Sequence, residues 1–264
     1  MSMEFTDRVL ILRIGKLRET DLWVRFLSPK RGIISAFAFG GSRSRRRFSG
    51  CLDVFNDVLF SVKTTQNGMY NILQEGTLMG SPRRLRSDWH RLGIAVNCAK
   101  FMEAFGVAPD GSKTAYMLLT EILATLENDL PLPFNLPVLF RACFVFSQGY
   151  ALGLENCAIC GTALRTALRV FFRVREGHFV CSSCSFSLPE PERVEDGFFD
   201  ALIGVKHETL DALAYVQEYS PLAWREGALA SLSSTGQQEC ARIVDAFIEH
   251  HVGLYWDSSR FVRI

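Results

Sequence analysis

The sequence predicts a mixed α+β chain of several domains, and three observations lead to this fold class. Apolar residues alternate with a period of two through the first 80 residues and recur every three or four residues afterwards. Two Cys-x-x-Cys pairs, twenty residues apart, interrupt the helical part. At 264 residues, the chain has room for two or three small domains. We therefore expect a β domain at 1–80, a helical domain at 81–152 and 190–264, and a cysteine module at 153–189 inserted into the helical domain.

Short strands separated by turn residues account for the first domain. Pro29 and Gly32 mark one turn, and Gln66-Asn67-Gly68 marks a hairpin, because Asn-Gly favours a tight turn. Five strands in about 75 residues suit a small closed barrel of the OB type, although an SH3-like barrel has a similar strand count. The strands are expected at 9–14, 22–27, 33–39, 54–62 and 70–79.

Arginine is concentrated in the loop between the third and fourth strands, where glycine and serine suggest a mobile segment. Residues 1–86 hold 15 Lys and Arg against 7 Asp and Glu, whereas the remainder holds 14 against 21. A basic first third indicates a polyanionic partner, and guanidinium groups on a barrel rim would bind phosphates through charge and paired hydrogen bonds. Without a partner, the loop would be an ordinary solvated segment. Its arginines are Arg43, Arg45, Arg46 and Arg47.

Four further barrel residues are candidate nucleic-acid contacts. Lys30 and Arg31, in the turn after the second strand, are expected to extend the basic face of the arginine loop. Trp23 and Arg25 alternate with the apolar residues of the second strand, so they should point outward. An outward Trp beside an Arg suits stacking on a base, and it equally suits packing beneath the next domain. The sequence leaves both interpretations open.

Helical periodicity begins after Ser81-Pro82. The segment 138–146 is apolar on almost every side, which predicts the central helix of a bundle. Pro189-Glu-Pro-Glu192 predicts a stiff acidic linker behind the cysteine module. Neither a signal peptide nor a membrane-spanning segment is expected, since the most apolar run is interrupted by Arg141. Helices are expected at 83–105, 113–126, 138–146, 205–219 and 237–255.

The two cysteine pairs form the most specific pattern in the chain. A short hairpin between the pairs should bring them together, which predicts a zinc ribbon holding one structural zinc ion. Two disulfides, a redox-active pair or an iron site are the alternatives, and disulfides would need an oxidising compartment. His178, close to the second pair, is interpreted as a surface residue of the hairpin. The predicted ligands are Cys157, Cys160, Cys181 and Cys184.

The other cysteines occur singly in apolar patterns, as expected for small core residues of a cytoplasmic protein. They are Cys51, Cys98, Cys143 and Cys240.

Nothing in the sequence predicts an enzyme. The motifs of phosphate-binding loops, serine hydrolases and zinc proteases are absent from the sequence. His250 and His251 are adjacent and therefore not helically spaced for a metal. One acidic cluster lies next to prolines in the expected linker, where a magnesium site is not expected. Its members are Glu190, Glu192, Glu195 and Asp196.

Four segments form a pattern through their order and spacing: Val9–Arg13, Arg18–Val24, Phe37–Gly40 with the arginine loop behind it, and Gly149–Glu155 before the first cysteine pair. In this pattern the chain resembles the RecO family of bacterial recombination-mediator proteins over nearly its whole length. It departs from the family at Leu17-Arg18, where an aromatic residue is common, which bears on local packing.

The resemblance implies an OB fold, a helical domain and a zinc ribbon. It also implies a non-catalytic DNA repair protein that binds single- and double-stranded DNA and anneals complementary strands. With the partner RecR, such a protein helps RecA replace single-strand-binding protein, whose acidic and apolar C-terminal tail it contacts. The rival interpretation is a zinc-ribbon adaptor that binds nucleic acid in transcription or translation, and it predicts RNA or polymerase binding in place of strand annealing.

Overall fold

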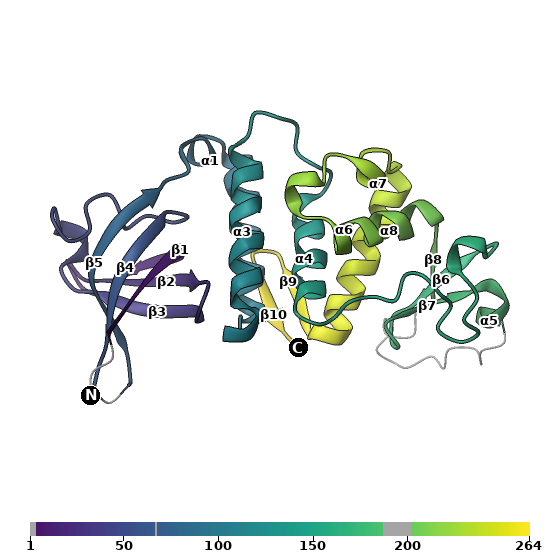
Figure 1. Cartoon of the computed structure of the whole chain (residues 1–264), viewed down its shortest axis with the longest axis horizontal. Helices are drawn as coiled ribbons and strands as arrows, with labels where there is room; N and C mark the ends of the chain where they lie inside the picture. The colour runs from purple at the N-terminus through teal and green to yellow at the C-terminus, as the bar shows by residue number, and fades with distance from the viewer. Residues whose placement is uncertain (1–3, 67, 187–201) are drawn as a thin grey trace. The chain divides into compact units, whose positions relative to one another are not determined.

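A computed structural model describes residues 4–66, 68–186 and 202–264 (Figure 1). The chain forms two compact units, Met1–Asn128 and Asp129–Ile264. The first unit holds the predicted β domain and three helices, and the second holds the remaining helices and the cysteine module. The finer three-domain division stays a prediction. Asn67 of the expected hairpin turn, the expected linker at 189–192 and the acidic cluster within 190–196 lie outside the described residues.

The first unit contains a closed five-stranded barrel. The strands follow the order β1-β2-β3-β5-β4, with β4 returning to β1, and only the β3–β5 pair is parallel. This order is that of the OB type, so the expected fold class is confirmed. The strands are β1 (Glu4–Lys16), β2 (Leu22–Ser28), β3 (Gly32–Ala38), β4 (Asp57–Thr64) and β5 (Asn71–Gly80).

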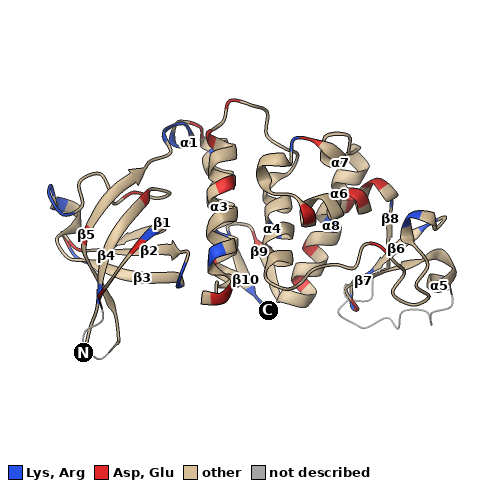
Figure 2. Cartoon of the chain, in the orientation of Figure 1, with Lys and Arg blue, Asp and Glu red and all other residues tan. Residues whose placement is uncertain are grey.

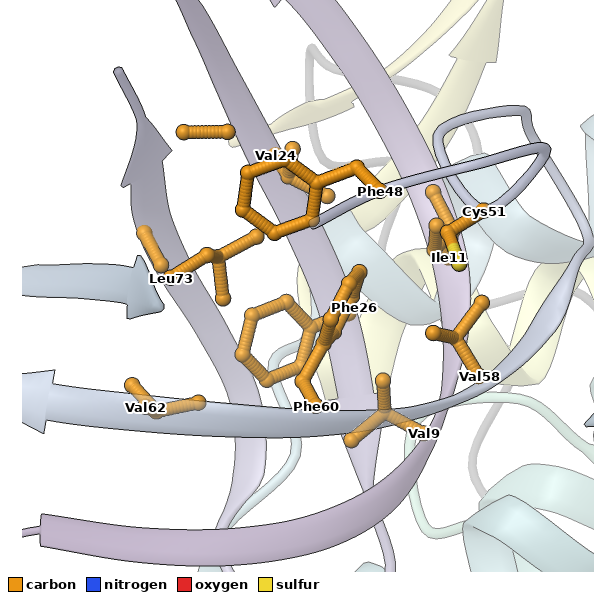
Figure 3. Close-up of a cluster of buried hydrophobic side chains, with 12 residues drawn as sticks. Val9, Ile11, Val24, Phe26, Phe48, Cys51, Val58, Phe60, Val62 and Leu73 are labelled. Carbon is orange, nitrogen blue, oxygen red and sulfur yellow. The ribbon is translucent and has the colours of Figure 1, made fainter. Parts of the chain in front are cut away.

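Alternate residues of the strands fill the barrel, and the loop between β3 and β4 contributes to the same core. Phe48 packs edge-on against Phe60, with ring centroids 6.4 Å apart, and Cys51 is fully buried. Figure 3 shows both loop residues in one cluster with Phe26 and Phe60. The expectation of a mobile loop is therefore wrong for its second half, because an aromatic side chain buried in the core fixes the backbone that carries it.

Three helices complete the first unit: α1 (Arg83–Ser87), α2 (Trp89–Phe105) and α3 (Ser112–Glu127). A single helix was expected over 83–105, but Asp88 breaks it. The Asp88 carboxylate accepts hydrogen bonds from the backbone N–H groups of His90 and Arg91, which caps α2. The break changes the helical phase, and Trp89, expected on the buried stripe, is 84% exposed.

In the second unit, nine of the twelve residues of α4 (Leu136–Ser147) are buried, which confirms the expected central helix. Its Arg141 is paired with Asp245 at 2.6 Å. The last expected helix ends early, because Gly253 adopts a left-handed φ of 68° and a hairpin follows it. Within the described residues, no helix is long and apolar enough to cross a membrane.

The remaining elements of the second unit are helices α5 (Ser182–Phe186), α6 (His207–Glu218), α7 (Gly227–Ala230) and α8 (Ser234–Phe247), the π-helical turn η5 (Ile248–Val252), and strands β6 (Val170–Arg173), β7 (His178–Cys181), β8 (Leu202–Val205), β9 (Leu254–Asp257) and β10 (Arg260–Arg263). Among the described residues of the two units there are four short 3-10 turns: η1 (Gly41–Arg43), η2 (Pro109–Gly111), η3 (Leu164–Thr166) and η4 (Pro221–Ala223).

Candidate metal centre and nucleic-acid interface

The cysteine module is built on a three-stranded sheet of order β7-β6-β8. The expected hairpin is present as β6 and β7, and β8 was not expected. Gly177 forms its turn with a φ of 67°. The hairpin rests on the C-terminal helix, since Phe172 of β6 and Phe247 of α8 have ring centroids 6.4 Å apart. His251 lies against the turn, with Nε2 2.8 Å from the carbonyl oxygen of Val174.

The first cysteine pair lies on a tight turn. The N–H of Gly161 donates to the carbonyl of Cys157 at 2.9 Å, and Gly161 has the positive φ of 73° that the turn requires. The N–H of Ala158 donates to the carbonyl of Phe179 at 3.0 Å, which ties this turn to β7. The second pair begins at the end of β7 and continues into α5, so the backbone itself brings both pairs to one place.

The four cysteine sulfur atoms all lie within 4.8 Å of one another. The Sγ atoms of Cys160 and Cys181 lie 3.7 Å apart. Around a tetrahedral ion with metal–sulfur bonds of about 2.3 Å, sulfur atoms are roughly 3.8 Å apart. The backbone N–H of Cys181 points at Cys157 Sγ from 3.4 Å, which suits a thiolate ligand. The set therefore fits one tetrahedral metal ion.

The electrostatics of the sulfur cluster favour a cation. The hydrogen bond between the side chains of Cys160 and Thr162 lowers the pKa of Cys160 to about 6. The neighbouring Cys160 and burial raise the pKa of Cys184 to about 12. Thiols this close oppose each other's ionisation, and a bound cation removes that opposition. His178 contributes none of the four clustered ligand atoms; it is half-buried rather than a surface residue, and burial lowers its pKa.

The four arginines of the β3–β4 loop are all exposed, and Figure 2 shows Lys and Arg gathered on this loop. The start of the loop is fixed to the β1–β2 connection. The N–H of Gly40 donates to the Asp21 carboxylate at 2.8 Å, and the N–H of Ser42 donates to the carbonyl of Thr20 at 3.1 Å. Arg47 itself donates to the carbonyl of Phe39 at 2.6 Å. The arginines are thus presented from an anchored rim of the barrel.

Lys30 and Arg31 are exposed but lie at the other end of the barrel. Register partners run from Leu22↔Ala38, beside the arginine loop, to Ser28↔Gly32, beside Lys30. Seven-residue strands separate these ends by roughly 20 Å. The expectation that the two residues extend the face of the arginine loop is therefore wrong. Whether they contact DNA stays a prediction.

Trp23 and Arg25 both point away from the barrel core, but they meet different surroundings. Arg25 reaches α2, where its Nε lies 3.3 Å from Glu103 Oε1 without the alignment of a hydrogen bond. Burial raises the pKa of Glu103, against the effect of the arginines around it. Arg25 thus lies against α2 of the helical part, and packing of this strand beneath the next domain is one of the two interpretations that the sequence left open. The indole of Trp23 lies across Gly15 of β1, and the guanidinium carbon of Arg13 lies 5.6 Å from the ring centroid.

Three aromatic residues near Trp23 were missed as site candidates. Phe37 lies on the outer face of β3, Phe39 directly follows that strand, and Tyr70 directly precedes β5. Phe37 and Phe39 alternate with small residues of the barrel core, and this pattern could have predicted that both point outward. Tyr70 carried no such signal, because its position depends on the parallel pairing of β3 with β5.

Comparisons with known proteins agree with this architecture. The family profile described as "Recombination protein O N terminal" matches residues 1–81, and that described as "Recombination protein O C terminal" matches residues 86–260. A DNA repair protein RecO from Nitratidesulfovibrio vulgaris strain DP4 is 50% identical over 99% of this chain and 100% of its own length. Proteins with the same name from Oleidesulfovibrio alaskensis and Lawsonia intracellularis are 48% and 37% identical over the same shares. The chain belongs to the RecO family of DNA repair proteins.

Proposed function

We propose that this protein is a non-catalytic DNA repair protein that binds single- and double-stranded DNA and anneals complementary strands. The observation that carries the proposal is the row of four exposed arginines on an anchored rim of an OB barrel. Backbone phosphates dominate the affinity of proteins for DNA, and arginine is well suited to bind them. The name shared by the relatives, DNA repair protein RecO, supports the same role.

Annealing is a process that such a surface can promote without bond-making chemistry. Two strands repel each other through their phosphates, and a basic surface lowers this repulsion. The excess of 15 Lys and Arg over 7 Asp and Glu in residues 1–86 supplies the charge. Contacts to phosphate carry no sequence information, so we expect binding that tolerates any sequence and weakens steeply with salt.

We further propose that the four clustered cysteines hold one zinc ion with a structural role. A closed site of four thiolates leaves no position for a substrate, and it contributes folding free energy directly. The metal would hold the two cysteine turns against the hairpin, which lies on α8.

Family membership also supports a set of partners. With RecR, we expect the protein to help load RecA onto DNA coated by single-strand-binding protein, and to bind the C-terminal tail of that protein. RecA would be affected indirectly, through removal of the coating. The proposed place of action is the bacterial cytoplasm, at the nucleoid.

The test is the annealing of two complementary oligonucleotides, one with a fluorophore and one with a quencher, measured over a salt series with and without single-strand-binding protein. Salt-sensitive acceleration that persists on coated strands is expected. Absence of acceleration, from folded protein with its metal in place, would refute the proposal and favour an adaptor that binds RNA or polymerase.

A further inference from the structure

We propose that the barrel face beside the arginine loop is a base-stacking platform that selects single-stranded DNA. Its members are Trp23, Phe37, Phe39 and Tyr70. The inference rests on the proposed DNA binding, and it adds the form of DNA that this face recognises.

The four aromatic side chains form one row over β2, β3 and the positions that directly follow β3 and directly precede β5. Trp23 on β2 and Phe37 on β3 are register partners, so their side chains are neighbours on the outer face. The ring centroid of Phe37 lies 6.2 Å from that of Phe39 and 5.9 Å from that of Tyr70. Phe39 is 41% exposed and Tyr70 is 44% exposed. Large aromatic side chains that remain this open side by side are available to a ligand.

The row continues towards β1 through a glycine. A Cβ atom at Gly15 would overlap the indole of Trp23, so only glycine lets the indole lie across this strand. The side chain of Arg13 then approaches the indole, with its guanidinium carbon 5.6 Å from the ring centroid.

Hydrogen bonds hold the exposed residues of the row in place. Arg47 donates to the backbone carbonyl of Phe39 at 2.6 Å. The N–H of Thr65 donates to the carbonyl of Tyr70 at 3.0 Å, and the Thr65 hydroxyl accepts from the N–H of Tyr70 at 3.3 Å. A surface fixed before binding loses little conformational entropy when a ligand arrives.

Charge indicates which ligand fits the aromatic row. Arg13 lies over Trp23, Arg47 bonds to the backbone of Phe39, and the other loop arginines follow Phe39 closely along the chain. This charge favours a polyanion over an apolar protein surface. A single strand offers both phosphates and the open faces of its bases, and bases stack on aromatic side chains irrespective of sequence. In a duplex the base faces are hidden by internal stacking. The arginines therefore serve both forms of DNA, whereas the rings serve the single strand alone.

The experiment compares DNA affinities of full-length, zinc-loaded variants by fluorescence anisotropy. The probes are a labelled oligothymidylate and a labelled blunt duplex of equal length. Phe39→Ala with Tyr70→Ala should weaken oligothymidylate binding roughly 5- to 150-fold per ring that stacks, and leave duplex affinity unchanged. Tyr70→Phe keeps the ring and should bind as the parent does. Leu59→Ala is the matched control, because this exposed apolar residue lies on the outer face of β4, outside the row.

Each outcome decides between the proposals. A selective loss for the single strand, with the salt slope of binding unchanged, supports the platform. An equal loss for both probes, or no loss for either, overturns the platform while DNA binding by the parent protein stands. If the parent protein binds neither probe, both the platform and the proposed function fail.

Discussion

Neutralising the exposed arginines of the β3–β4 loop gives the most direct quantitative test of the DNA interface. The change is Arg43→Gln, Arg45→Gln and Arg46→Gln in one variant. Arg47 is spared, because it donates to the carbonyl of Phe39 and helps to hold the loop. The three substituted side chains are exposed, so glutamine should leave the barrel intact and remove only charge.

The magnitude follows from counterion release. If each arginine neutralises one phosphate, the slope of log affinity against log salt should flatten by about 2.7 for a duplex and about 2.1 for a single strand. We take the phosphate contacts to contribute nothing at 1 M salt, where parent and variant should then bind equally. At 0.15 M salt the variant should bind the duplex roughly 170-fold and the single strand roughly 50-fold more weakly than the parent does.

The assay is fluorescence anisotropy at salt concentrations from about 50 mM to 200 mM, the range over which phosphate contacts change affinity most clearly. A matched control variant changes the net charge equally, by replacing three exposed arginines of the second unit with glutamine: Arg169, Arg242 and Arg260. It should bind as the parent does. An unchanged slope in the loop variant, or an equal fall in the control, would refute the assignment of the DNA site to this loop.

Three further predictions concern metal, core and pH. Cys157→Ser should lower bound zinc from one ion per chain to nearly none and reduce the melting temperature, measured by metal analysis and calorimetry; retention of the full zinc content would contradict the four-thiolate site. Phe48→Ala should lower the free energy of unfolding in urea by about 3–5 kcal/mol, whereas Arg45→Ala should change it by less than about 0.5 kcal/mol; equal effects would mean that the loop is not part of the core. Burial and the charge of Asp57 raise the pKa of Tyr116 to about 12, from 10.0 in the unfolded chain. Over this range the folded state retains a proton that the unfolded state loses, so the free energy of unfolding should fall as pH rises from about 10 to 12. Tyr116→Phe should reduce this fall, measured by urea titrations at several pH values. An unaltered fall would exclude Tyr116 as its source.

The sequence predicted the parts of the fold that depend on local signals. Alternation of apolar residues located the five strands, and an almost wholly apolar segment located α4. The two cysteine pairs located the cluster of four sulfur atoms, because the sequence between the pairs contains the hairpin that brings them together. Breaks between helices, and turns that end a helix, were harder to predict. Asp88 ends one helix and caps the next within a continuous apolar pattern, and Gly253 was read as part of a helix although it starts a hairpin.

The candidate nucleic-acid interface was only partly predictable, since it depends on which strands become neighbours. The arginine loop is visible in composition alone. That Lys30 lies at the opposite end of the barrel follows from the antiparallel pairing of β2 with β3. Tyr70 contacts Phe37 because β3 pairs in parallel with β5, and no local sequence pattern predicts this pairing. Arg25 looked available for DNA until α2 placed Glu103 beside it.

The arrangement of charge and aromatic rings explains how one surface could serve annealing. A base that stacks on Phe39 or Tyr70 offers its flat face to the protein and keeps its pairing edge free. In the proposed complex the arginine loop would neutralise the phosphates that repel a second strand. Once the second strand pairs, stacking within the duplex competes with the rings, so the bases leave the platform and only the phosphate contacts remain. The product should then be held less tightly than the substrate, so loss of the aromatic row should weaken binding of the single strand and leave binding of the annealed duplex unchanged.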